Sequence, residues 1–224
     1  MSLKRIVLFV EGDSDLDAVP VLVRRILNEI NPWEYLWLDH DAFRVHGVEN
    51  LSGNNQHKWL NWLGTAYKRG NVGAILLLLD GDADKFEGQL FCASIAARTL
   101  AERARDAGAG KLFSLACVFA CRELESWLIA GVESLRGKLL PDGRSGVRSH
   151  APLPEADTEI TPRGAKEWLD GQMDRGYKSS TDLQPLTQLL DLNCVRKRNP
   201  RSFRRLENAV HQLAEAIRTG NHIS

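Results

Sequence analysis

Short apolar segments alternate with amphipathic helical segments through the first 130 residues, and this alternation limits the possible folds more than any other feature. The segments at 4–10 and 74–79 are apolar and rich in branched side chains, which predicts two buried strands. Further strands are expected at 42–46 and 111–119, and helices at 15–30, 56–69, 90–107 and 123–130. An alternation of this kind predicts an α/β fold, in which helices cover both faces of a parallel sheet.

The pattern changes after residue 131. Residues 132–162 are rich in glycine, proline and charge and show little periodicity, which predicts a loop or a poorly ordered insertion. Helices are expected near 163–173, 182–190 and 201–218, the last with an apolar stripe typical of core packing. We therefore expect an α/β domain over 1–131, a loop insertion over 132–162, and a helical C-terminal extension over 163–224 that packs on the same domain.

The composition excludes several classes of protein. Hydrophobic residues make up 43% of the chain and charged residues 26%, as in a globular protein and unlike a disordered one. No apolar run approaches the ~20 residues of a membrane-spanning helix, and the N-terminal run is too short for a signal peptide. The four cysteines have neither a metal-finger spacing nor a dense disulfide pattern. We expect a cytoplasmic protein with reduced thiols and no membrane contact.

Acidic residues directly follow three of the expected strands. Glu11 follows the first strand, Asp80 and Asp82 follow the central one, and Glu123 and Glu125 follow the strand at 111–119. Because the carboxyl ends of parallel strands meet at one edge of a sheet, these carboxylates should lie close together. Crowded carboxylates repel one another, and a hard divalent cation with oxygen ligands relieves that repulsion. The pattern therefore predicts a Mg²⁺ or Mn²⁺ site.

Helix capping is the structural alternative for polar residues that follow a strand. Ser14 is expected to cap the first helix, and Asp84 with Glu87 fits a capping pair better than a metal site. The buried stripe of the helix at 123–130 runs between Glu123 and Glu125, so only one of the two should face the acidic cluster. The sequence leaves open which one.

The acidic motifs resemble those of the Toprim domain, the metal-dependent catalytic fold of topoisomerases, primases and OLD-family nucleases. The resemblance covers about the first 130 residues. It rests on Glu11 after the first strand, on Asp80-Gly81-Asp82 after a later strand, and on Asp15, which lies four residues after the Glu as in OLD-like members. It implies a Toprim-like, Rossmann-like catalytic domain over 1–131.

A closer resemblance covers nearly the whole chain. It is to bacterial proteins of a Toprim-like family catalogued as domain of unknown function 4276, and three segments carry it: 123–128, 177–183 and 202–206. Proteins of this type are often encoded near ATPases of the ABC/OLD kind and are suspected in phage defence. The resemblance implies an endonuclease-type hydrolase that cleaves phosphodiester bonds of DNA or RNA with Mg²⁺ or Mn²⁺ as cofactor.

Under this resemblance the metal-binding residues are all carboxylates: Glu11, Asp15, Asp80, Asp82, Glu123 and Glu125. Glu11, Asp80 and Asp82 would be the catalytic residues and would hold a first ion. Asp15 and one member of the later glutamate pair would support a second ion. Glu11 is also a candidate general acid or base.

Basic residues gather near the C-terminus, with six of them between positions 196 and 205. Arg201, Arg204 and Arg205 point away from the apolar stripe of the last helix, so they are candidates for contacts with nucleic-acid phosphates. Lys178 is a candidate for stabilising charge on a phosphate. A solvated basic face is an equally good interpretation of these residues.

Two other functions remain open from the sequence. A phosphotransfer or phosphohydrolase domain also gathers acids around Mg²⁺ at strand ends, but Glu11-Gly12-Asp13 fits the first acidic motif of receiver domains only loosely. The net charge of zero favours a non-catalytic or partner-activated regulatory subunit of an ABC/OLD-type ATPase. A nuclease that acts alone usually carries a stronger basic groove.

Overall fold

A parallel sheet forms the centre of the protein. The computed structural model describes residues 3–154, 157–160, 162 and 164–224. The sheet has five strands in the order β2-β1-β4-β7, and β3 also pairs with β1. The strands are β1 (Lys4–Val10), β2 (Leu36–Leu38), β3 (Phe43–Arg44), β4 (Val72–Asp80) and β7 (Ser114–Ala120). Every pairing in this sheet is parallel, which confirms the predicted α/β class.

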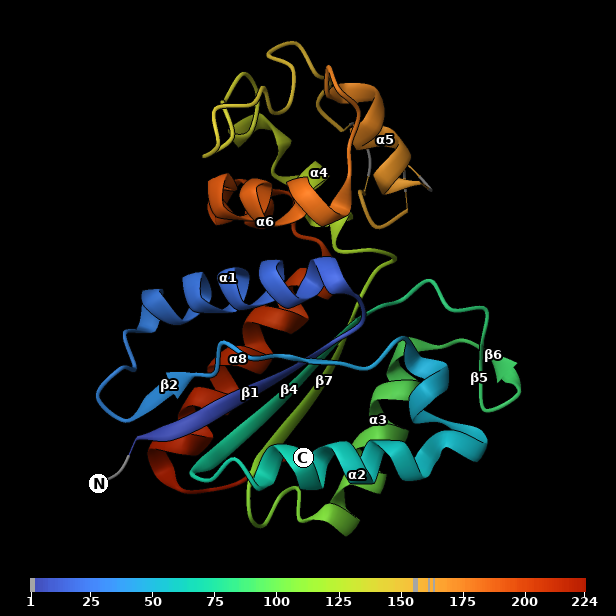
Figure 1. Ribbon diagram of the computed structural model, residues 1–224, viewed down its shortest axis with the longest axis vertical. Coiled ribbons are helices and arrows are strands. Elements are labelled where there is room, and N and C mark those ends of the chain that lie inside the picture. The colour runs from blue at the N-terminus through green and yellow to red at the C-terminus, as the bar shows by residue number, and fades with distance from the viewer. Residues whose placement is uncertain (1–2, 155–156, 161, 163) are drawn as a thin grey trace.

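Helices cover both faces of the sheet (Figure 1). Helices α1 (Asp13–Ile30) and α8 (Arg201–Thr219) pack on one face, and α2 (Gln56–Tyr67) and α3 (Ala93–Ala104) pack on the other. Successive residues of β4 alternate between the two apolar cores, so that Leu76 and Leu78 face the first pair of helices while Ile75 and Leu77 face the second. This double burial explains why β4 is an unbroken apolar run.

A group of shorter helices lies at one end of the molecule, above α1 in Figure 1. It contains α4 (Glu125–Ala130), α5 (Ala165–Gln172) and α6 (Ser179–Leu189), and α7 (Leu192–Arg198) follows α6 in the chain. The described residues between α4 and α5 form no long element, but Leu140, Val147 and Ala151 are buried in the same core as α1. The described part of this segment therefore packs against the domain. Residues 155–156, 161 and 163, part of the expected insertion and of the next expected helix, lie outside the described residues.

The remaining elements are small. Strands β5 (Lys85–Phe86) and β6 (Gln89–Leu90) form an antiparallel hairpin. The part of the chain that the structure describes also contains four 3-10 segments: η1 (Val48–Leu51), η2 (Gly53–Asn55), η3 (Arg105–Ala107) and η4 (Val132–Ser134). Among the described residues, none of the helices combines the length and the apolar character needed to cross a membrane.

Two of the predicted helix caps are wrong. Helix α1 begins one residue before Ser14, and its N-cap residue is Gly12, whose N–H donates to the Asp15 carboxylate. Asp84 does not precede a helix. Its expected partner Glu87 lies in the turn of the β5–β6 hairpin, where its carboxylate accepts hydrogen bonds from Arg103 and from the backbone of Gly53. At α1 the capping contact is still local but involves other residues, whereas Glu87 makes tertiary contacts in place of the expected cap.

A buried carboxylate joins β1, the end of β2 and the turn after α2 at the edge of the sheet. Asp39, which follows β2, accepts hydrogen bonds from Arg5 at 2.7 Å and from Arg69 at 2.8 Å, and its side chain is 5% exposed. Burial raises the pKa of Asp39, but the hydrogen bonds from the two arginines lower it by more, so the pKa lies below its usual range. The ionised form of Asp39 therefore stabilises the fold.

Replacing Asp39 with Asn should lower the free energy of unfolding by about 1–3 kcal/mol at pH 7, because two arginines lose their counter-charge. A depressed carboxyl pKa contributes stability above the unfolded value of about 4, and this contribution is lost as the pH falls through the folded value. Urea unfolding should therefore show a smaller difference in the free energy of unfolding between wild type and Asp39→Asn at pH 3 than at pH 7. Asp41→Asn, at an exposed neighbour, is the control. Equal stabilities of wild type and Asp39→Asn at pH 7 would contradict this account.

Candidate functional site

The ends of β1, β4 and β7 are joined through two carboxylates. The backbone N–H of Asp80, at the end of β4, donates to Glu11 Oε2 at 3.2 Å, just beyond β1. Asp80 Oδ1 in turn accepts the backbone N–H of Leu124, beyond β7, at 3.0 Å. Gly81 lies so close to β7 that a Cβ at this position would be 2.4 Å from the carbonyl oxygen of Ala120. The expected convergence of these acidic residues at one edge of the sheet is thus observed.

Asp15 joins this cluster from the first turn of α1. Its carboxylate accepts the Gly12 N–H at 2.9 Å through Oδ2, and the residue is 7% exposed. The Asp15 carboxylate is close enough to Asp80 to raise the pKa of that residue. The structure therefore brings Asp15 to the position that the spacing after Glu11 suggests.

Glu123 and Glu125 both take part in the cluster, so the expectation that only one faces it is wrong. Helix α4 begins at Glu125, and every residue of this helix is buried, so the assumption of a single buried stripe does not hold. Glu125 is 2% exposed and accepts a hydrogen bond from the Tyr177 hydroxyl at 2.9 Å. Glu123 precedes the helix, and its carboxylate is 2.8 Å from the ammonium of Lys166.

Lys166 is a site residue that the sequence did not single out. It lies in the first turn of α5, and its Nζ is 2.8 Å from Glu123 Oε1 and 3.9 Å from Asp80 Oδ2. The nearby carboxylates, Glu125 foremost, raise the pKa of Lys166 against the effect of its burial. An isolated lysine in a helix carries no motif, so only the packing of α5 on α4 could reveal this contact.

The electrostatics of the cluster are dominated by burial and by repulsion between carboxylates. Burial, with the charge of Asp82, raises the pKa of Glu11 to about 7. Burial, with the charges of Glu125 and Asp15, raises the pKa of Asp80 well above its usual range. Burial also raises the pKa values of Asp15 and Glu125. The cluster therefore holds more negative charge than Lys166 balances, which is the condition that favours binding of an additional cation.

The chemistry of the donors fits a hard divalent cation. Glu11, Asp15 and Asp80 each accept a backbone N–H at one carboxylate oxygen, so the other oxygen of each is the one that an ion could bind. Among the described residues, however, no three His, Cys, Asp or Glu side chains are already arranged to hold one ion. The ammonium of Lys166 lies within the same cluster. Binding of an ion would therefore require a rearrangement of these side chains.

The other predicted site residues lie around this cluster. Asp82 is exposed and acts on Glu11 through its charge. Arg201, Arg204 and Arg205 are exposed on the first turns of α8. These turns lie beside the end of β7, because the Ser202 hydroxyl accepts the backbone N–H of Cys121 at 3.1 Å.

Lys178 is exposed just before α6. Its backbone N–H donates to the buried carboxylate of Asp182 at 2.8 Å. The other basic residues of the C-terminal run have protein partners: Arg196 pairs with Glu29 and Glu207, and Lys197 pairs with Glu133. The basic surface that remains for a ligand is therefore smaller than the sequence suggests.

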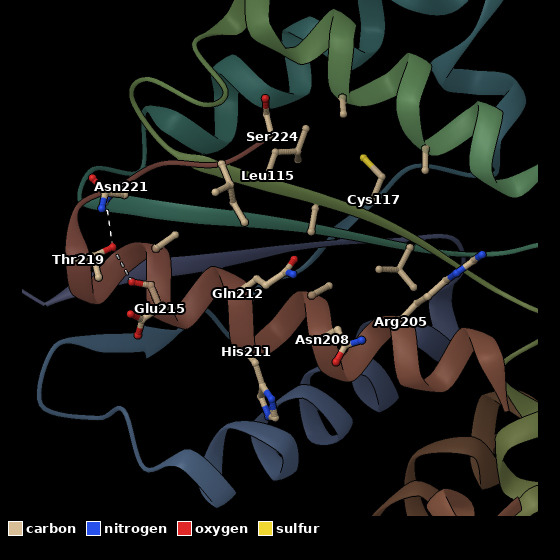
Figure 2. Close-up of a pocket in the computed structure, with 17 residues that line it drawn as sticks. Leu115, Cys117, Arg205, Asn208, His211, Gln212, Glu215, Thr219, Asn221 and Ser224 are labelled. Carbon is tan, nitrogen blue, oxygen red and sulfur yellow. Dashed lines mark hydrogen bonds between the residues drawn. The ribbon is translucent and has the colours of Figure 1, made fainter. Parts of the chain in front are cut away.

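A separate groove runs along the outer edge of β7, between α3 and α8 (Figure 2). Its volume is about 1030 Å³, and small apolar side chains of both helices line it together with polar residues of α8. Arg205 reaches into this groove from α8. The acidic cluster does not line it.

One family model matches the chain. It carries the description Domain of unknown function (DUF4276), and the match spans residues 10–211, from the end of β1 into α8. The matched region includes all the carboxylates of the cluster together with Lys166 and Tyr177. No curated protein and no solved structure gave a significant match.

Proposed function

This chain belongs to the family described as Domain of unknown function (DUF4276), and we propose that it is a Toprim-type, metal-dependent nuclease that hydrolyses phosphodiester bonds of DNA or RNA. The observation that carries the proposal is the cluster of buried carboxylates at the carboxyl ends of β1, β4 and β7. Burial and mutual repulsion raise the pKa values of Glu11, Asp80 and Glu125, so it is unfavourable for the fold to keep these carboxylates ionised together without a cation. Such a cost to stability is common at functional sites.

Glu11, Asp15 and Asp80 are the residues that would hold Mg²⁺ or Mn²⁺, with Asp82 at the exposed side of the cluster and Glu123 and Glu125 behind it. When bound, such an ion supplies Lewis-acid activation of a phosphoryl oxygen. On its open side the cluster presents the exposed carboxylate of Asp82. A polar surface of this kind suits a hydrated ion and a charged substrate better than an apolar ligand.

The protein's own groups supply the remaining chemistry in this proposal. Glu11 has a pKa of about 7 without a bound ion, so it is the candidate general acid or base in the alternative in which Asp15 and Asp80 hold the ion without it. The ammonium of Lys166, when it turns from Glu123 toward substrate, stabilises negative charge on the phosphate. Arg201, Arg204 and Arg205 lie at the same end of the sheet and would bind backbone phosphates, so that binding weakens as salt increases.

A partner-activated regulatory subunit of an ABC/OLD-type ATPase is the second candidate. The observation in its favour is the position of Lys166, whose ammonium already pairs with Glu123 and lies near Asp80. A partner that draws α5 away would free the carboxylates for an ion. From the resemblance to the family catalogued as domain of unknown function 4276, we also propose that the nuclease is the effector of a bacterial phage-defence system.

A cleavage assay tests the proposal. Supercoiled plasmid, single-stranded DNA and total tRNA are incubated with the wild-type protein in Mg²⁺, in Mn²⁺ or in EDTA, beside an Asp80→Ala/Asp82→Ala variant. We expect metal-dependent cleavage that the variant lacks. Metal binding by calorimetry without cleavage would support the partner-activated subunit. Absence of both cleavage and metal binding would refute the catalytic interpretation of the cluster.

A further inference from the structure

We propose that Tyr177 is a positioning residue of this site, whose hydroxyl fixes the orientation of the Glu125 carboxylate and thereby sets the affinity of the cluster for a divalent cation. The inference rests on the proposed function. Its basis is a single buried contact between two distant parts of the chain. The Tyr177 hydroxyl donates to Glu125 Oε1 at 2.9 Å, and the two residues are 8% and 2% exposed.

Packing alone does not require the hydroxyl of Tyr177. The ring lies in the apolar core beside α1 and α4, where a phenylalanine would fill the same space. A buried hydroxyl without a partner is unfavourable, and a buried carboxylate without a donor is more so. The two groups satisfy each other, so the pair is a specific polar contact within an apolar environment.

The loop that carries Tyr177 is itself held in place on both sides. On one side the Tyr177 N–H donates to Asp170 Oδ1 at 2.9 Å. Asp170 approaches so closely that a Cβ on Gly176 would be 2.4 Å from the same oxygen, and Gly176 has a φ of +72°. On the other side the N–H of Lys178 donates to the buried Asp182 carboxylate. The phenol is therefore presented to Glu125 from a rigid support.

Glu125 is placed where its orientation affects the rest of the cluster. Among the neighbouring charges, that of Glu125 does most to raise the pKa of Asp80. It also does most to raise the pKa of Lys166. Hydrogen bonds from outside the coordination sphere orient metal-binding carboxylates, and their loss typically reduces metal affinity or activity by about 10–100-fold. Tyr177 makes a bond of this kind to Glu125, the carboxylate that lies behind the three that would hold the ion.

Tyr177→Phe removes the hydroxyl and keeps the ring, so it is the variant of choice. We expect Mn²⁺ binding measured by calorimetry to weaken by about 10-fold or more, and kcat to fall by about 10–100-fold with little change in KM. The Mn²⁺ concentration for half-maximal cleavage should rise in parallel. Tyr67→Phe, at a tyrosine 41% exposed at the end of α2, should match wild type.

A double-mutant cycle with Glu125→Gln separates positioning from a structural role. If Tyr177 acts through Glu125, the Tyr177→Phe/Glu125→Gln protein should bind Mn²⁺ no more weakly than Glu125→Gln alone. Additive losses would overturn the inference, as would wild-type Mn²⁺ binding by Tyr177→Phe. If the wild-type protein neither binds Mn²⁺ nor cleaves nucleic acid, the proposed function fails and this inference fails with it. Cleavage by wild type that Tyr177→Phe retains in full refutes the inference alone.

Discussion

An Asp80→Asn variant should be more stable than the wild-type protein in the absence of divalent cations, and should also lose about 10²–10³-fold in cleavage rate. Asp80 lies at the centre of the acidic cluster, where burial and the charges of Glu125 and Asp15 make its ionised form unfavourable. An amide removes this charge and keeps an oxygen to accept the Leu124 N–H. We expect a gain of about 2 kcal/mol in the free energy of unfolding at pH 8.

The pH dependence of this gain has a definite sign. The pKa of Asp80 is raised in the folded protein, so the wild type loses stability as the pH rises from about 4, the unfolded value, toward the folded value. The advantage of Asp80→Asn should thus be near zero at pH 4 and grow with pH. Urea unfolding in EDTA between pH 4 and pH 8 measures it, with Asp13→Asn at an exposed neighbour as control. If Asp80→Asn is less stable than wild type at pH 8, the ionised Asp80 carboxylate does not destabilise the fold and this account is wrong.

Replacing Lys166 with Met should have the opposite effect on stability. Removal of the ammonium leaves Glu123, Asp80 and Glu125 without their nearest positive charge, so the free energy of unfolding in EDTA should fall by about 1–2 kcal/mol at pH 7.5. This estimate allows for the 40% exposure of the Lys166 side chain. Cleavage should fall by about 10²-fold if the ammonium stabilises charge on the phosphate.

Mn²⁺ should stabilise Lys166→Met more than it stabilises the wild type, because the ion then replaces the missing charge. Thermal unfolding with and without Mn²⁺ measures this difference. Lys111→Met is the matched control, since Lys111 is exposed and precedes β7 at the opposite end of the sheet. An equal Mn²⁺-induced shift in Lys166→Met and wild type would mean that Lys166 and the ion do not share a site.

Elements with a strong local pattern were predictable from the sequence. The strand at 4–10 agrees with β1 at both ends, and the apolar run at 74–79 forms the centre of β4. The last helix was found because its apolar stripe persists over five turns, and it agrees with α8 within one residue. Each of these elements is buried along its whole length or along one complete face, so hydrophobic periodicity is enough to define it.

Elements that depend on distant partners were missed. β2 has only three residues, and its pairing with β1 could not be read from Leu36-Trp37-Leu38 alone. The strand expected at 42–46 is reduced to the two residues of β3. α7 was not predicted at all, because its basic residues suggested an open surface. In the structure Arg196 pairs with Glu207 on the next helix and with Glu29, which is far away in the sequence.

The residues of the candidate site also fall into those with a local sequence pattern and those that depend on distant partners. Its carboxylates were predictable because each follows a buried strand and the topology of a parallel sheet brings strand ends together. Lys166 and Tyr177 were not. Lys166 lies in no motif, and the segment 177–183 carried a family resemblance without a role for Tyr177. Both residues reach the cluster only through tertiary packing of the C-terminal part of the chain. The buried environment of α4 also explains why the angular argument on Glu123 and Glu125 failed.

The order of residues around the site has a consequence for how the protein is made. The carboxylates, from Glu11 to Glu125, leave the ribosome well before Lys166 and Tyr177. The face of β4 and β7 on which α8 packs also stays uncovered until α8 has been synthesised. A nascent or prematurely terminated chain therefore carries the acidic residues without the groups that hold them in place. Under the proposed nuclease function, we therefore expect no cleavage of the messenger and ribosomal RNA around the chain until its own translation is almost complete.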